Sequence, residues 1–277
     1  MARQTLRPPF EYYGGKTHLA PKIAALLPPH QHYVEPFAGS LAVLLAKEPS
    51  RAETVNDLDG DLVTFWRVLR DRPEELERVC ALTPHSVEEF VAAADRADCG
   101  ELEAARRVFV VLTQGREHSL ASRGAGGWRR RMNVAKVPPA PEMLSRQAAR
   151  ISTVAERMAG VSLENDDALD IIRRYGREPS VCIYADPPYL GDTRGSGGYG
   201  VDQRGDEFHQ AFADACNEAK ASVIISGYDS PLYAELFEGW HRIELTTRPT
   251  QSLDRKMEVL WSNQPFAGQG AFDIGLT

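Results

Sequence analysis

Residues 32–46, HYVEPFAGSLAVLLA, predict a short strand that ends near Glu35, a tight turn through Gly39 and a helix that begins near Ser40. The small residues of the turn allow the backbone to bend sharply and to approach a ligand closely. This stretch therefore predicts the first strand–turn–helix unit of an α/β fold.

The same plan follows at once in residues 52–71, AETVNDLDGDLVTFWRVLRD. They predict a strand to about Asn56 and then an amphipathic helix. The large apolar residues of this helix fall on one side, and they are Leu62, Phe65, Trp66 and Leu69. Two such units in succession favour a parallel sheet on which helices pack.

The alternation of strands and helices resumes after Gly160. Strands are predicted within GVSLEN (160–165), SVCIYAD (180–186), ASVIISG (221–227), HRIELTT (241–247) and EVLWSN (258–263), and a helix within FHQAFADACNEAKA (208–221). The fold class is therefore α/β, with a Rossmann-like, doubly wound and mostly parallel sheet.

Residues 73–150 interrupt this alternation. They predict helical segments and then a stretch rich in glycine, arginine and proline, SRGAGGWRRRMNVAKVPPAP (122–141), which is typical of a hairpin or extended loop. We therefore expect one domain made of residues 1–72 and 151–277, with residues 73–150 as a smaller, mainly helical insert that carries a hairpin.

The composition is that of an ordinary globular protein. The chain has 277 residues, of which 43% are hydrophobic, and no apolar run approaches the roughly 20 residues of a membrane span. The N-terminus lacks the apolar core of a secretory signal. The four cysteines show neither metal-ligand spacing nor a disulfide framework. We expect a cytoplasmic protein with no metal site and no membrane partner.

Charge is distributed unevenly along the chain. The net charge is −7, which alone argues weakly against a polyanionic partner. Residues 51–103 hold six Lys/Arg against fourteen Asp/Glu, a local balance of −8, whereas residues 104–150 hold ten against two, a balance of +8. A basic surface suits phosphates. The alternative is that these charges only solvate helix faces, but the basic run also contains Gly124, Gly126, Gly127 and Trp128, unlike a plain helix.

Acidic residues follow the first two predicted strands, at the edge where ligands bind in a doubly wound sheet. Asp57 comes about twenty residues after Glu35, the spacing expected of an acid that meets ribose hydroxyls. The turn between them has one glycine where a pyrophosphate site has three. S-adenosylmethionine (AdoMet) is therefore favoured over a dinucleotide. The alternative is that both acids are exposed loop residues.

Residues 181–192, VCIYADPPYLGD, predict a buried strand that ends in an acid, two prolines and a tyrosine. The Asp186 carboxylate and the Pro187 carbonyl oxygen are two acceptors for the hydrogens of an exocyclic amine, and Tyr189 offers a stacking face. Such acceptors draw the nitrogen towards a tetrahedral form and free its lone pair. A sulfonium methyl group then needs only to lie in line, so catalysis is mainly positioning and electrostatics. The alternative is an ordinary strand exit.

The N-terminal segment EYYGGK (11–16) predicts a turn, because Gly14 and Gly15 accept backbone conformations that side chains disfavour. Lys16 then presents its ammonium group to a carboxylate, either that of the AdoMet methionine tail or that of Glu35. The alternative is a Gly-Gly turn that simply begins a helix.

These three motifs, EYYGGK, VEPFAGS (34–40) and DPPY (186–189), together resemble the adenine-specific DNA N6-methyltransferases of the Dam type. ISGYDSPLYAEL (225–236) and EVLWSN are similar to later strands of phage and prophage members. The resemblance extends over nearly the whole chain and implies an AdoMet-dependent methyltransferase fold. It also implies that the recognition domain lies between the cofactor region and the catalytic motif.

Residue by residue, the resemblance assigns a cofactor set and a catalytic set. The catalytic residues are Asp186, Pro187 and Tyr189, which hold the target adenine. The cofactor-binding residues are Tyr12, Gly14, Lys16, Glu35, Phe37, Gly39, Ser40, Asp57, Asp167 and Asp186. Asp166 and Asp167 follow the third strand, where the family often places a side chain near the cofactor adenine.

DNA recognition is expected from the insert and from the loop after Tyr189. The insert candidates are Arg116, Arg123, Arg129, Arg130, Arg131, Asn133 and Lys136, with arginine suited to phosphates and to guanine edges. Asn133 could instead shape the turn. The loop LGDTRGSGGYGVDQRG (190–205) has six glycines and is expected to close over a flipped base, with Arg194 and Tyr199 as contacts. The alternative is a surface loop with no role.

The predicted function is site-specific methylation of adenine N6 in double-stranded DNA, by base flipping and direct in-line transfer from AdoMet. A cognate restriction nuclease is a candidate partner, and a monomer is the expected state. The nearer alternative is amino-methylation of cytosine N4 or of RNA, because the chemistry at the amine is the same. The more distant alternative is a non-catalytic module that binds AdoMet or DNA.

Overall fold

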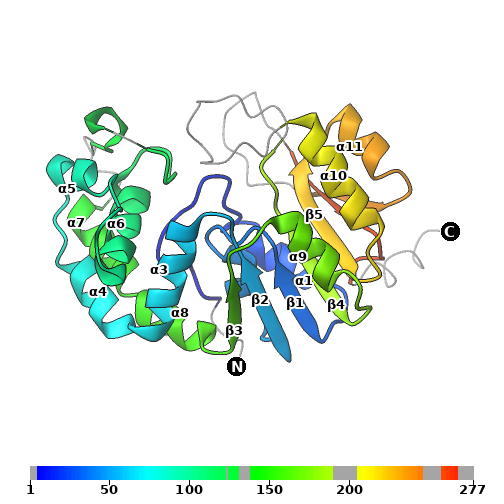
Figure 1. The fold of residues 1–277 in the computed structure, drawn as a ribbon, viewed down its shortest axis with the longest axis horizontal. Coiled ribbons are helices and arrows are strands. Elements are labelled where there is room, and N and C mark those ends of the chain that lie inside the picture. The colour runs from blue at the N-terminus through cyan, green and yellow to red at the C-terminus, as the bar shows by residue number, and fades with distance from the viewer. Residues whose placement is uncertain (1–4, 123, 131–137, 190–204, 246–256, 268–277) are drawn as a thin grey trace.

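Seven strands form a single sheet in the computed structural model, which describes residues 5–122, 124–130, 138–189, 205–245 and 257–267 (Figure 1). The strand order is β3-β2-β1-β4-β5-β7-β6, and β7 runs in the opposite direction to the other six of these strands. The strands are β1 (His32–Glu35), β2 (Ala52–Asn56), β3 (Val161–Glu164), β4 (Val181–Ala185), β5 (Ser222–Tyr228), β6 (His241–Leu245) and β7 (Glu258–Ser262). This confirms the predicted Rossmann-like, mostly parallel sheet.

Helices lie on both faces of the sheet and at one end of it. In chain order they are α1 (Ala20–Leu26), α2 (Ala42–Ala46), α3 (Gly60–Asp71), α4 (Pro73–Ala81), α5 (Val87–Ala92), α6 (Glu101–Gln114), the 3₁₀ turn η1 (Ala125–Gly127), α7 (Ala140–Ala148), α8 (Ile151–Met158), α9 (Ala168–Tyr175), α10 (Asp206–Asn217) and α11 (Pro231–Leu236). No helix in the described ranges is long and apolar enough to cross a membrane.

The helix after β1 begins two residues later than the sequence predicts. Gly39 and Leu41 have left-handed backbone, with φ of 48° and 56°, so the turn continues to Leu41 before α2 starts at Ala42. The left-handed region is unfavourable for a leucine, and no residue pattern marks it in advance. The Leu41 side chain is fully buried, and this burial offsets part of the backbone cost.

Alternate residues of the central strands face two separate apolar cores. Tyr33, Cys182 and Ile224 belong to the core that includes α1, α3 and the helices of the insert. Their chain neighbours Val34 and Ile183 face the core formed with α9, α10 and α11. This two-residue alternation is the pattern of a sheet buried on both faces.

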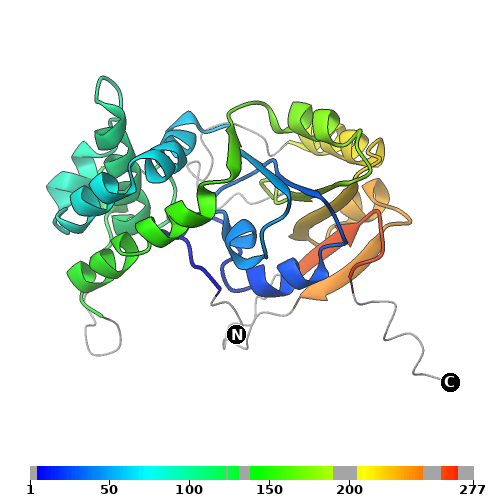
Figure 2. The same cartoon turned by 90° about the horizontal axis from the view of Figure 1, so that it is seen from below.

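Helices α4 to α8 gather at one end of the molecule, beside β3 (Figures 1 and 2). Their core residues, such as Phe90 and Val108, are continuous with the core beneath the sheet. Between α6 and α7, Gly115 and Trp128 form an antiparallel bridge, and the Arg129 N–H donates to the Gln114 carbonyl at 2.8 Å. Part of the expected hairpin is therefore present. The domain boundaries at residues 73 and 150 stay a prediction.

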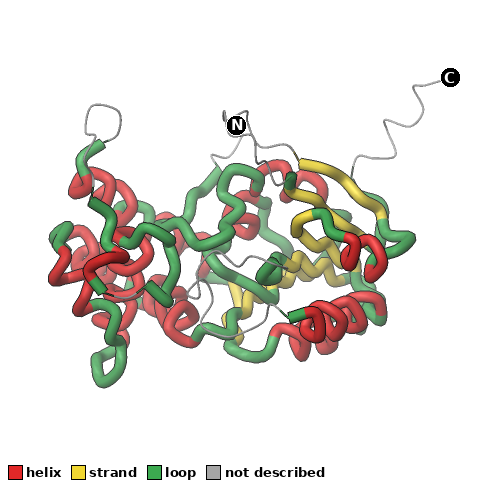
Figure 3. Tube along the Cα trace, turned by 90° about the horizontal axis from the view of Figure 1, so that it is seen from above, coloured by secondary structure: helices red, strands yellow, loops and turns green. Residues whose placement is uncertain are grey.

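The strand order reverses between β1 and β4, which are hydrogen-bonded neighbours with Val34 opposite Ile183. The loops after these two strands lead to opposite sides of the sheet and leave a crevice between them. Figure 3 shows this region from above, with the strands passing beneath the loops. Glu35 and Asp186, at the two strand ends, are thereby brought to one site.

Candidate active site

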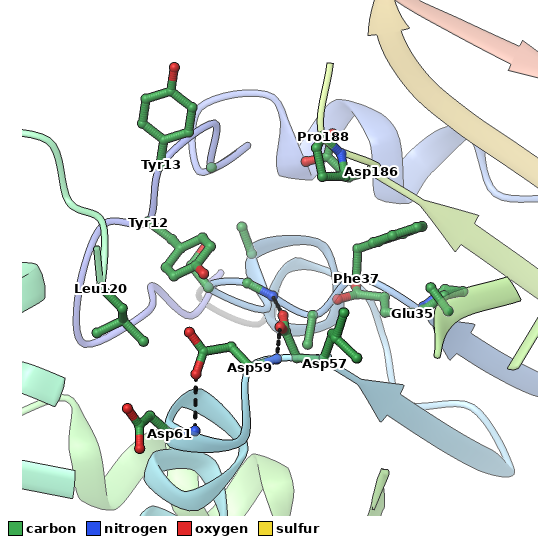
Figure 4. Close-up of a pocket in the computed structure, with 18 of the residues that line it drawn as sticks. Tyr12, Tyr13, Glu35, Phe37, Asp57, Asp59, Asp61, Leu120, Asp186 and Pro188 are labelled. Carbon is green, nitrogen blue, oxygen red and sulfur yellow. Dashed lines mark hydrogen bonds between the residues drawn. The ribbon is translucent and has the colours of Figure 1, made fainter. Parts of the chain in front are cut away.

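A cavity of about 840 Å³ lies at the carboxyl ends of β1, β2 and β4 (Figure 4). It is lined by the N-terminal turn, the loops after β1 and β3, the loop that leads into α3, the segment after β4, and the residues Arg96, Leu120 and Ala121. Of the predicted cofactor residues it brings together Tyr12, Lys16, Glu35, Phe37, Gly39, Ser40, Asp57 and Asp186. Residues more than 100 positions apart in the chain thus share one site.

The N-terminal turn depends on its two glycines. Gly14 has a φ of +72°, a conformation that favours glycine. The Gly15 N–H donates to the Tyr12 carbonyl at 2.8 Å, and a Cβ on Gly15 would lie only 2.8 Å from that same oxygen. A side chain at either position would therefore disturb the turn and displace Lys16.

Lys16 is held by Asp186. Its buried Nζ donates to Asp186 Oδ2 at 2.8 Å and to the Gly14 carbonyl at 2.7 Å, and it lies 3.8 Å from Glu258 Oε1. The structure therefore gives Lys16 a partner other than the Glu35 carboxylate considered in the sequence analysis. This ion pair joins the N-terminal turn directly to the strand that carries the aspartate.

Asp186 accepts three hydrogen bonds. Besides Lys16, the hydroxyls of Tyr189 and Ser226 donate to its Oδ1, at 2.9 and 2.8 Å. Each carboxylate oxygen has two lone pairs, so Oδ1 is fully used only while Tyr189 donates to it, and Oδ2 retains one acceptor position. Asp186 is thus fixed in orientation while part of its acceptor capacity faces the cavity.

Glu258, the first residue of β7, is a site residue that sequence reasoning missed. Its Oε1 accepts from the Tyr189 hydroxyl at 2.5 Å, and its side chain is only 10% exposed. Burial raises the pKa of Glu258 to about 7, against the opposing effect of Lys16. The available signal was an acid at the start of an otherwise apolar strand, a position that normally carries an apolar residue.

Tyr189 is buried between two neighbours rather than lying free at the strand exit. Lys16 Nζ lies 4.7 Å from the centre of its ring, and the Tyr228 ring meets it edge to face at 4.5 Å. Tyr189 also lines a second cavity, of about 410 Å³, with Tyr228, Tyr233 and Arg242. Pro187, which lies between Asp186 and Tyr189 in the chain, is buried as well.

The loop after β1 is organised by buried acids. Glu35 Oε1 accepts from the Tyr33 hydroxyl at 2.6 Å and from the Leu44 N–H at 2.8 Å. Burial raises the pKa of Glu35 to about 8. A cationic group placed beside this carboxylate would favour its ionised form.

Asp57 connects this loop with the one that leads into α3. Its two oxygens accept from the Gly39 and Asp59 N–H groups, each at 3.0 Å, and burial raises its pKa to about 6. Asp59 caps α3 by accepting from the Asp61 N–H at 3.0 Å. Figure 4 shows the carboxylate of Asp59 between Tyr12 and the start of α3, so it is a second acid at this wall.

Two of the predicted cofactor residues, Gly14 and Asp167, are not among the residues that line the cavity. The side chain of Asp167 caps α9 by accepting from the Leu169 N–H at 2.7 Å. Asn165 and Ala168 of the same turn do line the cavity. The cofactor role of Asp167 stays a prediction, and Asn165, like Asp59, is a lining residue that the sequence pattern did not indicate.

The predicted DNA-binding arginines in the described hairpin differ in their surroundings. Arg129 is half-buried, and its guanidinium donates to the Gly115 carbonyl at 2.6 Å and contacts His118 Nε2 at 2.7 Å. His118 in turn lies 3.1 Å from Glu11. Arg116 and Arg130 are exposed beside Trp128, where Arg130 lies 5.8 Å from the ring centre.

Six of the predicted DNA-binding residues lie outside the described residues, and they are Arg123, Arg131, Asn133, Lys136, Arg194 and Tyr199. Their roles stay predictions.

Comparison with known proteins places this geometry in context. The family model described as "D12 class N6 adenine-specific DNA methyltransferase" matches residues 12–251. The chain is 26% identical to a Type II methyltransferase, M1.LlaDCHI, of Lactococcus lactis subsp. cremoris, over 87% of this chain and 88% of that protein. Among solved structures, it is similar to a SAM-dependent methyltransferase from Agrobacterium tumefaciens. That likeness has a TM-score of 0.37 at 13% identity and covers 89% of this chain and 59% of the other.

Proposed function

The chain belongs to the D12 class of N6 adenine-specific DNA methyltransferases, and from this premise we propose which of its residues hold the cofactor, the target base and the DNA. It transfers a methyl group from AdoMet to the N6 of adenine in DNA. The observation that carries the assignment of residues is the hydrogen-bonded group of Lys16, Asp186 and Tyr189, in which Lys16 and Asp186 line the first cavity and Tyr189 lines the second.

The first cavity fits AdoMet in both its size and its charge. A volume of about 840 Å³ lies within the range for sites that enclose a nucleoside-sized ligand. Its polar lining is mostly acidic, with Glu35, Asp57, Asp59 and Asp186, and its buried lysine is already paired. Such a lining suits a sulfonium, an ammonium group and ribose hydroxyls, and it disfavours a pyrophosphate.

Within this cavity we assign Asp57 and Asp59 to the ribose hydroxyls and Glu35 to the cationic part of the methionine moiety. Each oxygen of Asp57 accepts one backbone hydrogen bond and so has one further lone pair. When bound, AdoMet supplies a methyl group activated by the positive sulfur. The chain supplies position, and it supplies acceptors for the amine that is to be methylated.

The target adenine is assigned to the second cavity, which shares Tyr189 with the Asp186 group. Its aromatic wall of Tyr189, Tyr228 and Tyr233 suits a flat base, and entry requires that the base leave the duplex. Asp186 Oδ2 and the Pro187 carbonyl oxygen then accept hydrogen bonds from N6. These bonds strengthen as the nitrogen becomes positive, so they stabilise the transition state more than the ground state.

Replacing Gly39 by alanine tests the cofactor assignment. Gly39 has a φ of +48°, and an added Cβ would lie 3.2 Å from Cδ1 of Tyr12, whose ring lines the cavity. We expect the AdoMet dissociation constant to rise about tenfold, which corresponds to about 1.4 kcal/mol, in a calorimetric titration. Gly239→Ala is the matched control, because Gly239 has a φ of +80° with nothing within 4 Å of the added Cβ. Equal AdoMet affinity in both variants would contradict the assignment.

DNA binding is assigned to the hairpin and its exposed arginines. The structure distinguishes Arg116 and Arg130, which are exposed, from Arg129, which braces the hairpin against His118. The double variant Arg116→Ala/Arg130→Ala should weaken DNA binding and lower the slope of log K against log salt by about 2, measured by fluorescence anisotropy. Arg173→Ala/Arg177→Ala, which removes two exposed arginines at the end of α9, is the control. An unchanged slope would remove these arginines from the interface.

We retain a cognate restriction nuclease as a candidate partner, supported by the likeness to a protein named a Type II methyltransferase. A monomer is retained as the expected oligomeric state.

A further inference from the structure

The hydroxyl of Tyr189 lies between two carboxylates and carries one proton. Its oxygen is 2.9 Å from Asp186 Oδ1 and 2.5 Å from Glu258 Oε1. Lys16 Nζ, at 2.8 Å from Asp186 and 3.8 Å from Glu258, is the single cation within reach of both carboxylates among the described residues. The tyrosine can donate to only one of the two acids at a time.

We propose that Glu258 is a positioning residue for methyl transfer, which acts through Tyr189 to open an acceptor position on Asp186 and to receive the proton that the amine loses. This inference rests on the proposed roles of Asp186 and Tyr189. When Glu258 is ionised, it accepts from Tyr189, and Asp186 Oδ1 is left with Ser226 as its donor. When Glu258 is protonated, it donates to Tyr189, which then donates to Asp186 and fills Oδ1.

The proton balance of the reaction follows the same path. The N6–CH₃ bond forms as the S–CH₃ bond breaks, and N6 is left with a positive charge and one hydrogen too many. That hydrogen passes to Asp186. Asp186 then donates it to the Tyr189 oxygen as Tyr189 passes its own proton to Glu258. At the end Asp186 is again a carboxylate, Tyr189 is neutral, and Glu258 holds the proton until it exchanges with solvent.

The charges around Glu258 are consistent with this role. The groups that face it are Lys16 from the N-terminal turn, Asp186 and Tyr189 from the segment after β4, and Tyr228 opposite it on β5. When Glu258 is protonated, the charges of Lys16 and Asp186 cancel, and the group formed by Lys16, Asp186 and Glu258 has no net charge. A cationic ligand in the first cavity favours the ionised form, which is the form that accepts the proton.

Glu258→Gln tests this role, because it keeps the size of the side chain and removes its ability to take up a proton. At saturating AdoMet and DNA and at pH 8, the single-turnover rate should fall on the order of 10²-fold. The KM for AdoMet should change by less than about threefold. Without ligand the pKa of Glu258 is about 7, and the cationic AdoMet lowers it, so the wild-type rate should rise with pH and level off by about pH 7. One unit below the pKa only about a tenth of Glu258 is ionised, so one unit below the midpoint of the wild-type profile the gap between the two proteins should narrow to about tenfold.

Two further variants make the result decisive. Glu235→Gln, the same change at an exposed position on α11, should match the wild type. Tyr189→Phe keeps the ring and Glu258 but removes the connecting hydroxyl, so its rate should no longer rise with the ionisation of Glu258. The double variant Tyr189→Phe/Glu258→Gln should be no slower than Tyr189→Phe alone. Glu35, whose pKa is about 8, also titrates in this pH range, but it is present in every variant. The difference between the pH profiles of the wild type and the variants therefore reports Glu258 alone.

A Glu258→Gln enzyme with wild-type rates at every pH would overturn the proposal while leaving the methyltransferase function intact. A Glu258→Gln enzyme that is slow by the same factor at pH 8 and one unit below the midpoint of the wild-type profile would also overturn it, because a purely structural loss does not follow ionisation. If Glu258→Gln does not fold, the Tyr189→Phe profile decides alone.

Discussion

Asp186→Ala is expected to reduce methyl transfer on the order of 10³-fold, in line with the loss of one preorganised polar group at a transition state. The change removes the acceptor for the N6 hydrogens and leaves the donors Lys16, Tyr189 and Ser226 without their common partner. The assay is transfer of labelled methyl groups from AdoMet to double-stranded DNA, followed by digestion to nucleosides. The wild type should yield N6-methyladenine and the variant almost none.

The same experiment separates catalysis from folding and from DNA binding. Asp170→Ala removes an exposed aspartate on α9 that pairs with Arg173, and it should leave the rate unchanged. Asp186→Asn keeps the shape of the side chain and one acceptor oxygen. Its amide NH₂ group, however, would face either the Lys16 ammonium group or the N6 amine, which are both donors. Methyl transfer by this variant should therefore remain strongly impaired. DNA affinity should change by less than about threefold in all of them. Near-normal turnover by Asp186→Ala would remove the aspartate from the mechanism.

Glu53→Ala is expected to lower the free energy of unfolding by about 3–5 kcal/mol, the usual cost of removing one partner from a buried ion pair. Glu53 lies on β2 and accepts from Lys47 Nζ at 2.6 Å and from Arg157 at 2.5 Å, and all three side chains are at most 7% exposed. Its removal leaves two buried cations without a carboxylate. Urea unfolding followed by circular dichroism measures the loss.

An exposed ion pair provides the control. Glu142 and Arg146 pair on the surface of α7, and Glu142→Ala should change the unfolding free energy by less than about 0.5 kcal/mol. A loss as small as this in Glu53→Ala would show that water reaches the two cations. The buried group also supports the active site, because Lys47 lies 4.6 Å from the ring centre of Tyr33, whose hydroxyl donates to Glu35.

The contribution of Glu53 depends on pH in a definite direction. Burial raises its pKa, but the hydrogen bonds from Arg157 and Lys47 outweigh burial, so the pKa in the folded protein lies below the ordinary value of 4.5. A group with a lowered folded pKa stabilises the protein fully above its unfolded pKa. The difference in stability between wild type and Glu53→Ala should therefore be constant above pH 4.5 and shrink as the pH falls further.

The strand ends were the part of the site that sequence could predict, and the reason is geometric. Parallel strands deliver their last residues to one edge, so Glu35, Asp57 and Asp186 could be grouped from the apolar runs that precede them. Their hydrogen-bond partners could not be grouped in this way. Nothing in residues 11–16 indicates that Lys16 pairs with Asp186 instead of Glu35, because that choice depends on how the turn crosses the sheet.

The arginines of the hairpin show the same limit. In a run such as WRRR, sequence cannot tell which guanidinium turns inward, and the Gly115 carbonyl and His118 that receive Arg129 become neighbours only after the hairpin folds. Glu258 was missed for a related reason. Its strand pairs with β5 in the antiparallel sense, and a pattern of apolar residues carries no information on strand direction.

The reversed direction of β7 determines which end of this strand lies at the catalytic edge of the sheet. Every parallel strand delivers its last residue there, so outgoing loops alone supply residues from those strands. In β7 the first residue lies at that edge, opposite Tyr228 at the end of β5. The residue before it, Met257, lines the second cavity. One inverted strand therefore places the start of a strand at an edge where the other strands place their ends, and Glu258 reaches the site in this way.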